Sequence, residues 1–437
     1  MRGGLSRDWA IGRASQYEVC VMVVVCRWMA LVVALMLGSF ASSPRAEPAR
    51  TRPQPALTIL ISLDGFRPDY LDRGNTPALS ALAAGGARGA MRPSFPSLTY
   101  PNHYSLVTGK RPDHHGMVNN TLEDAAIPGA SFSMSNHDAV GDGRWWDQAK
   151  PIWVSAEQQG VHAGILFWPG SEARIDGVRP SRWKVFDMKM SSNDRVDTLL
   201  SWIDAKDPLL GFATLYFDRT DTEGHHYGPD SPEVNAAAAE VDAAIGRLVE
   251  GLKARGLYAT TNLVVVADHG MAPQPLSGLV DVATLVDPAK VRFVSTGSIV
   301  GVRALPGFEA EVAAAMLKAH PHLTCWRKKR IPARYGYGTN PRVPPIVCLA
   351  DRGWYFATAS ALKKRLEEHP RDGGAHGYDP FDPAMRAVFV AHGPAFKSGV
   401  VLPVFDNVDV YPLLTRLIGV KGDKGDGKLG PLKAALR

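Results

Sequence analysis

Cysteine is scarce in this sequence, with four residues among 437. Cys20 and Cys26 lie in an apolar N-terminal stretch, which leaves Cys325 and Cys348 as the pair in the rest of the chain. The scarcity excludes a small scaffold held together by disulfides, and the spacing of the second pair does not fit a zinc ribbon. In an oxidising compartment Cys325 and Cys348 are candidates for one disulfide; the alternative is two buried free thiols.

A strong charge of one sign is also lacking. The formal net charge is +6, and residues 1–46 contribute +3 of it through five arginines against two acids. The remaining chain therefore offers no strongly basic face for nucleic acid. Internal repeats are absent as well, which excludes a solenoid or propeller. The composition, 45% hydrophobic and 21% charged, is typical of a globular protein.

One long apolar run is present, at residues 19–41, where Arg27 is its one interruption. An apolar segment at 28–40, followed by small residues up to Ala46, predicts a signal peptide over residues 1–46. A Pro- and Arg-rich linker, 47–56, follows. We expect cleavage near Ala46 and a periplasmic or secreted protein.

The polar part of this leader is unusually long. A translation start at Met22 or Met29 would explain it, and so would an uncleaved signal anchor, because the apolar run approaches membrane-spanning length. The protein would contact a membrane only in the anchored case.

Buried strands alternate with amphipathic helices from residue 57 onward, which predicts an α/β fold whose mostly parallel central sheet is flanked by helices. Between 275 and 370 the alternation loosens and predicts a smaller α/β excursion, with paired strands around a Pro- and Gly-rich loop at 323–356. The predicted catalytic domain spans 57–420, and the Gly- and Lys-rich tail, 421–437, is expected to be flexible. The expected strands are 57–63, 162–168, 211–217, 261–270, 291–304 and 386–391.

Acids and imidazoles follow several of these strands. They are Asp64, Asp221 with His225 in a polar segment expected to be a loop, Asp268 with His269, and His376 between glycines. Carboxyl ends of parallel strands meet at one edge, where ligands bind in open α/β sheets. Three carboxylates and three imidazoles without cysteine fit zinc-type metals and suffice for two sites when a hydroxyl completes one. The alternative for Asp268 and His269 is ordinary turn and cap chemistry.

Thr99 precedes a helix expected to begin at Pro101. A helix N-terminus favours anions, and a hydroxyl there can act as a nucleophile if a metal or base is near. The alternative is that Thr99 is an ordinary N-cap residue.

Six segments together resemble the nucleotide pyrophosphatase/phosphodiesterase family of the alkaline phosphatase superfamily. The resemblance extends from about Leu57 to Ile418 and is closest to bacterial single-domain members, because cysteine-rich modules are lacking. The segments are Leu63–Arg67 (LDGFR), Thr99–Tyr104 (TYPNHY), Val107–Gly109 (VTG), Asp221–Pro229 (DTEGHHYGP), Ala267–Met271 (ADHGM) and Gly374–Asp379 (GAHGYD).

This resemblance implies an alkaline phosphatase-like fold and two zinc ions. The first zinc would be bound by Asp64, Thr99, Asp268 and His269, and the second by Asp221, His225 and His376. It implies that Thr99 is the nucleophile, which forms a covalent phospho-threonine diester that water hydrolyses. Asn120 would bind a non-bridging phosphate oxygen, and His225 rather than His226 would be the ligand.

The implied activity is hydrolysis of small-molecule nucleotide phosphodiesters to nucleoside 5′-monophosphates. Tyr100 would flank a nucleobase, with Phe186 or Trp183 on its other face, although Trp183 and Phe186 could equally be plain packing aromatics. The alternatives are a lipid or choline phosphodiesterase, a phosphate monoester, sulfate or phosphonate hydrolase of the same superfamily, and a non-enzymatic, metal-stabilised binding domain.

Overall fold

The computed structural model describes residues 56–437. The predicted signal peptide, 1–46, and all but the last residue of the predicted linker, 47–56, lie outside the described residues. Among residues 56–437, no helix has both the length and the hydropathy needed to cross a membrane.

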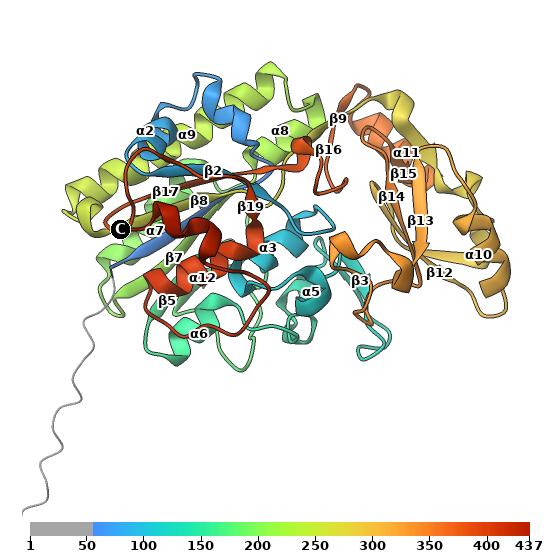
Figure 1. Cartoon of the computed structure of the whole chain (residues 1–437), viewed down its shortest axis with the longest axis horizontal. Helices are drawn as coiled ribbons and strands as arrows, with labels where there is room; N and C mark the ends of the chain where they lie inside the picture. Colours follow the sequence, from blue (N-terminus) through green and yellow to red (C-terminus); the bar gives the residue numbers. More distant parts are fainter. Residues whose placement is uncertain (1–55) are drawn as a thin grey trace, which may run out of the picture. The chain divides into compact units, whose positions relative to one another are not determined.

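A nine-stranded sheet forms the centre of the described chain (Figure 1). Its order is β18-β2-β17-β8-β1-β7-β5-β6, with β19 beside β2. β17 runs antiparallel to both of its neighbours, and all other pairs are parallel. This confirms the predicted mostly parallel sheet. The strands are β1 (Thr58–Leu63), β2 (Ala87–Arg92), β5 (His162–Leu166), β6 (Arg182–Lys184), β7 (Leu210–Phe217), β8 (Asn262–Val266), β17 (Ala387–His392), β18 (Val400–Val401) and β19 (Phe405–Asp406).

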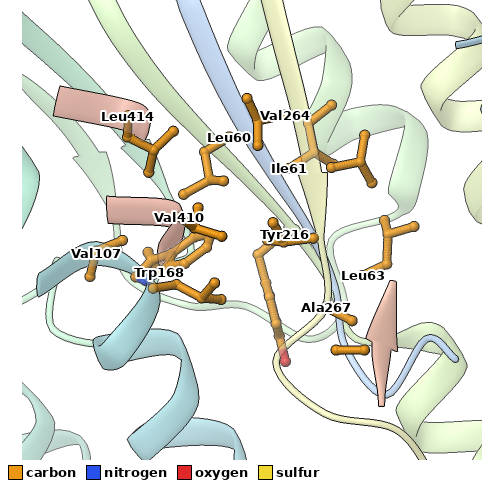
Figure 2. Close-up of a cluster of buried hydrophobic side chains, with 14 of the residues drawn as sticks. Leu60, Ile61, Leu63, Val107, Trp168, Tyr216, Val264, Ala267, Val410 and Leu414 are labelled. Atoms are coloured by element: carbon orange, nitrogen blue, oxygen red, sulfur yellow. The ribbon is translucent and has the colours of Figure 1, made fainter. Parts of the chain in front are cut away.

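The three central strands are buried along their whole length, as their continuous apolar runs predicted. Successive side chains of β1 point to opposite faces of the sheet. In Figure 2, Leu60 points toward Val410 and Leu414, whereas Ile61 points to the other side. Both faces must therefore be covered by helices.

Two groups of helices provide this cover (Figure 1). α2 (Pro77–Ala84), α7 (Ser192–Asp204) and α9 (Pro232–Ala254) pack together on one side. α3 (Thr99–Thr108), α6 (Ile152–Gln158) and α12 (Val410–Leu417) pack together on the other. The start of α9 follows the expected chemistry, because the Ser231 hydroxyl accepts from Val234 N and Pro232 occupies the first helical position.

The predicted excursion is a four-stranded antiparallel sheet with the order β11-β12-β14-β13. The single strand expected at 291–304 is a hairpin, because the chain turns at Gly297, whose φ of +122° disfavours other residues. The elements are β11 (Val291–Ser295), β12 (Ile299–Ala304), α10 (Glu309–Leu317), β13 (Leu323–Arg327), β14 (Ile346–Ala350) and α11 (Ala359–Glu368).

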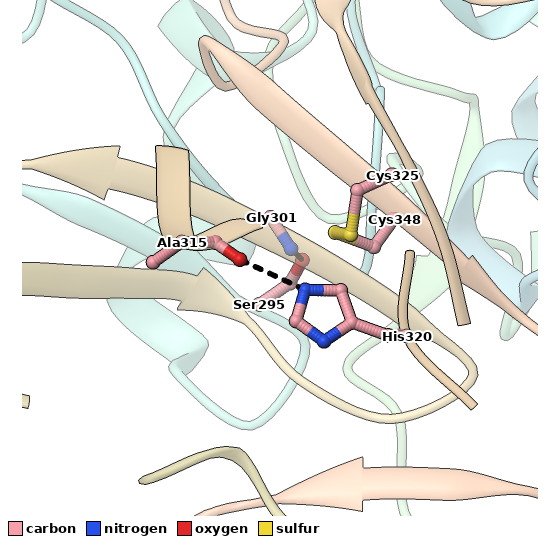
Figure 3. The surroundings of a disulfide bond; sticks show 6 residues. All are labelled: Ser295, Gly301, Ala315, His320, Cys325 and Cys348. Atoms are coloured by element: carbon pink, nitrogen blue, oxygen red, sulfur yellow. Dashed lines mark hydrogen bonds between the residues drawn. A yellow bond between two sulfur atoms is a disulfide. The ribbon is translucent and has the colours of Figure 1, made fainter. Parts of the chain in front are cut away.

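A disulfide joins Cys325 of β13 to Cys348 of β14 (Figure 3). The two residues are directly opposite one another in the antiparallel pair. The sequence prediction of a bridge between the arms of this segment is therefore confirmed, and two free thiols are excluded.

Smaller elements connect these parts. β16 pairs with β9, β10 with β15, and β3 with β4. The elements are β3 (Thr121–Glu123), β4 (Ser131–Ser133), β9 (Ala272–Gln274), β10 (Leu279–Asp281), β15 (Tyr355–Ala357), β16 (Gly373–Ala375), α4 (Pro112–His115), α5 (His137–Gly141) and α8 (Arg219–Tyr227).

Two predictions about local structure were wrong. The polar segment after β7 is the helix α8 rather than a loop, because it packs against α9 and β16. The tail, 421–437, expected to be flexible, packs on the domain. Leu432 and Ala435 are buried, and Asp426 N donates to Gly109 O at 2.7 Å.

Candidate metal centre

The predicted ligands meet at the carboxyl edge of the central sheet. Asp64 directly follows β1, and Asp268 follows β8, its parallel neighbour. α8 begins just after β7, the other neighbour of β1, and brings Asp221 to the same edge. Gly65 allows this approach, because its φ is +66° and a Cβ there would lie 3.1 Å from Asp221 Cα.

Three carboxylate oxygens at this edge are buried without a hydrogen-bond partner. They are Asp64 Oδ1, Asp221 Oδ1 and Asp268 Oδ2. The opposite oxygens of the two strand-end acids are engaged, since Tyr216 Oη donates to Asp64 Oδ2 at 2.6 Å and Gly65 N donates to Asp268 Oδ1 at 3.3 Å. Unpartnered buried carboxylate oxygens are costly unless a cation binds them.

The three predicted histidine ligands share one orientation. In each ring Nδ1 lies 2.9 Å from a backbone carbonyl oxygen, that of Gly374 for His225, Gly270 for His269 and Ser97 for His376. A carbonyl accepts only, so Nδ1 donates and a neutral ring keeps its lone pair on Nε2. Nδ1 donation to a carbonyl with Nε2 left free is the usual arrangement of a metal-binding histidine.

The Nε2 atoms point at the carboxylates. His269 Nε2 lies 2.9 Å from Asp268 Oδ2 and 3.5 Å from Asp64 Oδ1. In the other set, Asp221 lies 3.4 Å from His225 Nε2 and 3.8 Å from His376 Nε2. The residues present therefore fit divalent cations bound by oxygen and nitrogen.

The two ligand sets adjoin one another. The rings of His269 and His376 stack with centroids 3.5 Å apart. One group of ligand atoms within 4.8 Å of one another takes Asp221, His269 and His376, and thus combines residues from both predicted sets. These distances support one joint centre. The division of its residues between two ions comes from the family resemblance.

His103 belongs to a second such group, with Asp64 and Asp268. Both of its ring nitrogens are already engaged: Nδ1 lies 2.9 Å from Thr99 O, and Nε2 lies 2.8 Å from Ser62 Oγ. We therefore interpret His103 as a supporting residue that also lies 3.4 Å from Asp268 Oδ2.

The electrostatics of the strand-end pair favour a bound cation. Burial, together with the charges of Asp268 and Asp221, raises the pKa of Asp64 well above its ordinary value. Burial also opposes ionisation of Asp268, but His269 and His103 hold its pKa below the ordinary value. Burial and the neighbouring imidazoles His269 and His225 lower the pKa of His376, which keeps this ring neutral as a ligand must be.

Thr99 is the first residue of α3 rather than its N-cap, which is Leu98. Its Oγ1 lies 3.3 Å from His269 Nε2, and only 7% of the residue is exposed. The interpretation of Thr99 as a capping residue was therefore wrong. Its hydroxyl joins the ligand cluster at a helix N-terminus, where backbone N–H groups favour negative charge.

Asn120 lies beside this helix start. Its Oδ1 accepts from Tyr100 N at 2.9 Å, so its Nδ2 lies on the other side of the amide. Asn120 also lines a cavity of about 420 Å³ together with His225 and His376. The structure thus places the predicted phosphate-binding amide next to the ligand cluster.

A second, narrower cavity of about 80 Å³ adjoins Thr99 on the side of Tyr100. Phe186 and Tyr100 both line it, and that the two rings flank a base stays a prediction. Trp183 does not line this cavity, and its ring packs under the Arg179 guanidinium at 4.4 Å instead. A further cavity of about 840 Å³, bordered by Arg67 and Trp354, contains none of the predicted site residues.

Two supporting residues were missed by the sequence prediction, namely Tyr216 and His103. Tyr216 lies in the buried strand β7, next to β1, which is followed by Asp64. Its hydrogen bond to Asp64 depends on the register that pairs Ser62 with Tyr216. His103 stands four residues after Thr99 on the same helical face, and this spacing is a signal that sequence reasoning could have used.

Comparisons with known proteins concern the family and the fold. The family model of type I phosphodiesterase/nucleotide pyrophosphatase matches residues 58–379. The human ectonucleotide pyrophosphatase/phosphodiesterase family member 5 is 33% identical over 370 residues, which cover 84% of this chain and 76% of that protein. The human bis(5′-adenosyl)-triphosphatase ENPP4 is 32% identical over 412 residues, or 93% of this chain and 87% of that protein.

Solved structures give the same result. Murine ectonucleotide pyrophosphatase/phosphodiesterase 5, solved as an inactive threonine-to-alanine variant in complex with AMP, superimposes with a TM-score of 0.81. The two chains are 32% identical, and the match covers 87% of this chain and all of that one. The relatives named here are eukaryotic, so the expected likeness to bacterial single-domain members stays a prediction. The chain belongs to the type I phosphodiesterase/nucleotide pyrophosphatase family and is a hydrolase of that type.

Proposed function

We propose that this enzyme uses two zinc ions and Thr99 to hydrolyse nucleotide phosphodiesters to nucleoside 5′-monophosphates. The observation that carries the proposal is the buried Thr99 hydroxyl, 3.3 Å from His269 Nε2, within a cluster that has three unpartnered carboxylate oxygens. If the cluster had only a structural role, these buried oxygens would have no partner and would lower the stability of the protein.

The proposed division of ligands follows the family resemblance. Asp64, Thr99, Asp268 and His269 would hold one ion, and Asp221, His225 and His376 the other. When bound, the ions would lower the pKa of the Thr99 hydroxyl and stabilise negative charge on the phosphoryl oxygens. Nitrogen and oxygen ligands without cysteine suit zinc.

The chain's own residues would carry out the following steps. Thr99 Oγ1 forms a bond to phosphorus as the oxygen of the leaving group departs, and water then displaces Thr99 to release the 5′-monophosphate. The N-terminus of α3 and the Asn120 amide would stabilise the non-bridging oxygens. Burial at Thr99 excludes bulk water from the first step.

The nucleoside would occupy the narrow cavity beside Thr99. Tyr100 and Phe186 line it, with Trp168 and Tyr216 as further aromatic walls. Flat aromatic walls suit a planar base through stacking, which discriminates little among bases. The murine relative was solved in complex with AMP, which supports a nucleoside monophosphate as the product.

The test compares three chromogenic substrates: nitrophenyl thymidine 5′-monophosphate, nitrophenyl phosphate and nitrophenyl phosphocholine. We expect the first to be cleaved with the highest kcat/KM and expect a chelator to abolish its turnover. Faster cleavage of the phosphocholine or of the monoester would replace the proposal with a lipid diesterase or a monoesterase, respectively. The absence of all three activities with zinc bound would favour a binding domain.

We also propose export to the periplasm or the extracellular space. The apolar leader at 1–46 and the disulfide of Cys325 with Cys348 support this localisation. Mass spectrometry of the exported protein should show an N-terminus near residue 47. An N-terminus upstream of Trp28 would instead indicate an anchored protein.

A further inference from the structure

A cavity of about 280 Å³ extends away from the second ligand set. Four residues line both this cavity and the 420 Å³ cavity beside the ligand cluster, so the two cavities adjoin one another. They are His225, Thr296, Tyr355 and Ala375. The nucleoside cavity beside Thr99 shares no lining residue with either of these two cavities, so we assign the two adjoining cavities to the leaving group.

Arg365 of α11 lines the far cavity. Its guanidinium donates to two backbone carbonyls, those of His369 and Arg371. Within the described chain no carboxylate forms an ion pair with Arg365, and no aspartate or glutamate lines this cavity. Partial burial lowers the pKa of Arg365, so an anion in the cavity would stabilise its charge.

Two histidines line the cavity beside Arg365. The rings of His226 and His369 stack with centroids 3.9 Å apart and planes inclined by 23°. Each neutral imidazole provides one N–H donor, so an anion there would find donors from both rings and from the guanidinium. His226 directly follows His225 on α8, which connects this donor set to the catalytic cluster.

We propose that Arg365, His226 and His369 form an anion subsite that binds the distal phosphate of the leaving group. The inference rests on the proposed function, because it assigns the cavity to the substrate portion that departs. The enzyme would then prefer anionic leaving groups, such as the pyrophosphate of ATP or the second nucleotide of a dinucleoside polyphosphate. A guanidinium binds phosphate in a bidentate manner, which makes Arg365 the strongest contributor.

A purely structural role for Arg365 makes a different prediction. A Cβ on Gly373 would lie 2.8 Å from Arg365 Nη2, so the side chain packs against the segment that leads to His376. If Arg365 only supports this segment, its replacement should impair every substrate equally. If it binds the leaving group, the loss should depend on the charge of that group.

The experiment measures kcat/KM of wild type and Arg365→Gln for ATP and for nitrophenyl thymidine 5′-monophosphate, whose nitrophenyl group carries no phosphate. We expect about a tenfold loss for ATP and a change of less than about twofold for the chromogenic ester. His369→Gln should show the same selectivity with a smaller loss. The matched control is Lys364→Gln. Lys364 precedes Arg365 on α11, and its own side chain is 73% exposed.

A binding measurement separates this inference from the catalytic proposal. By calorimetry on a Thr99→Ala background, Arg365→Gln should weaken ATP about tenfold and leave AMP unchanged. Equal losses for ATP and AMP, or no loss for ATP, would overturn the subsite. If the wild type does not hydrolyse the chromogenic ester, the proposed function is refuted. The calorimetric comparison of ATP and AMP would still show whether the subsite exists.

Discussion

The two ligand sets of the candidate metal centre are built in different ways. Asp64 and Asp268 extend from central strands of the sheet and, with His269, are almost fully buried. Asp221 and His225 stand on α8, and the side chain of His225 is 39% exposed. The strand-end set, Asp64, Thr99, Asp268 and His269, is thus part of the core. The second set, Asp221 and His225 of α8 with His376 after β16, is called the helix set here, and its two histidines line the 420 Å³ cavity.

This difference separates two tasks. Burial and supporting hydrogen bonds restrict the strand-end set, which includes the proposed nucleophile Thr99. His225 and His376 of the helix set line the cavities that we propose for the leaving group. We therefore expect the two sets to respond differently to metal removal and to substitution.

The largest expected effect concerns metal removal. Dialysis against a chelator should release zinc in two phases, first from the helix set, where the side chain of His225 is 39% exposed, and then from the buried strand-end set. Turnover of nitrophenyl thymidine 5′-monophosphate should already fall by at least about a hundredfold in the first phase, since both ions would act on one phosphoryl group. Added zinc should restore it. A single phase of zinc release would contradict the difference in accessibility.

A smaller effect is expected at His103, which supports the strand-end set. His103→Gln should lower kcat about 10–100-fold, because supporting partners of metal ligands typically contribute on that scale. Ser62→Ala, which removes only the outer hydrogen bond at 2.8 Å, is the milder control. Equal, wild-type-like kcat in both variants would mean that His103 only fills space.

The smallest expected effect is on the stability of the metal-free protein. Asp64→Asn should raise its free energy of unfolding by about 0.5–2 kcal/mol, since it removes one of the mutually repelling buried carboxylates and retains an acceptor for Tyr216. His225→Asn, at a more exposed position, should change it by less than about 0.5 kcal/mol. Urea denaturation in the presence of a chelator measures both. A lower free energy of unfolding for Asp64→Asn would contradict the view that repulsion between the buried carboxylates destabilises the metal-free protein.

The same contrast explains how far the sequence could predict the structure. Continuous apolar runs that end in Asp64 and Asp268 predict buried parallel strands and an acid edge, and both are confirmed. Pattern alone misjudged the helix set, because the segment at Asp221 and His225 has few apolar residues. Its helix α8 depends on packing against α9 and β16 rather than on its own hydrophobic face.

Tertiary contacts account for what the sequence could not reveal. The hydrogen bond from Tyr216 to Asp64 requires the register between β7 and β1, which no local pattern specifies. The tail at 421–437 has the composition of a flexible segment, yet Asp426 accepts from Arg111 N at 2.7 Å. Such long-range partners stabilise a chain whose local preferences are weak.

The central claim is that Thr99 is the nucleophile of a metal-dependent diesterase, and one variant tests it most directly. Thr99→Ala should retain most of its zinc by elemental analysis, because Asp64, Asp268 and His269 remain. Its turnover of nitrophenyl thymidine 5′-monophosphate should fall at least about a thousandfold. Wild-type-like turnover in a zinc-loaded Thr99→Ala enzyme would contradict the account.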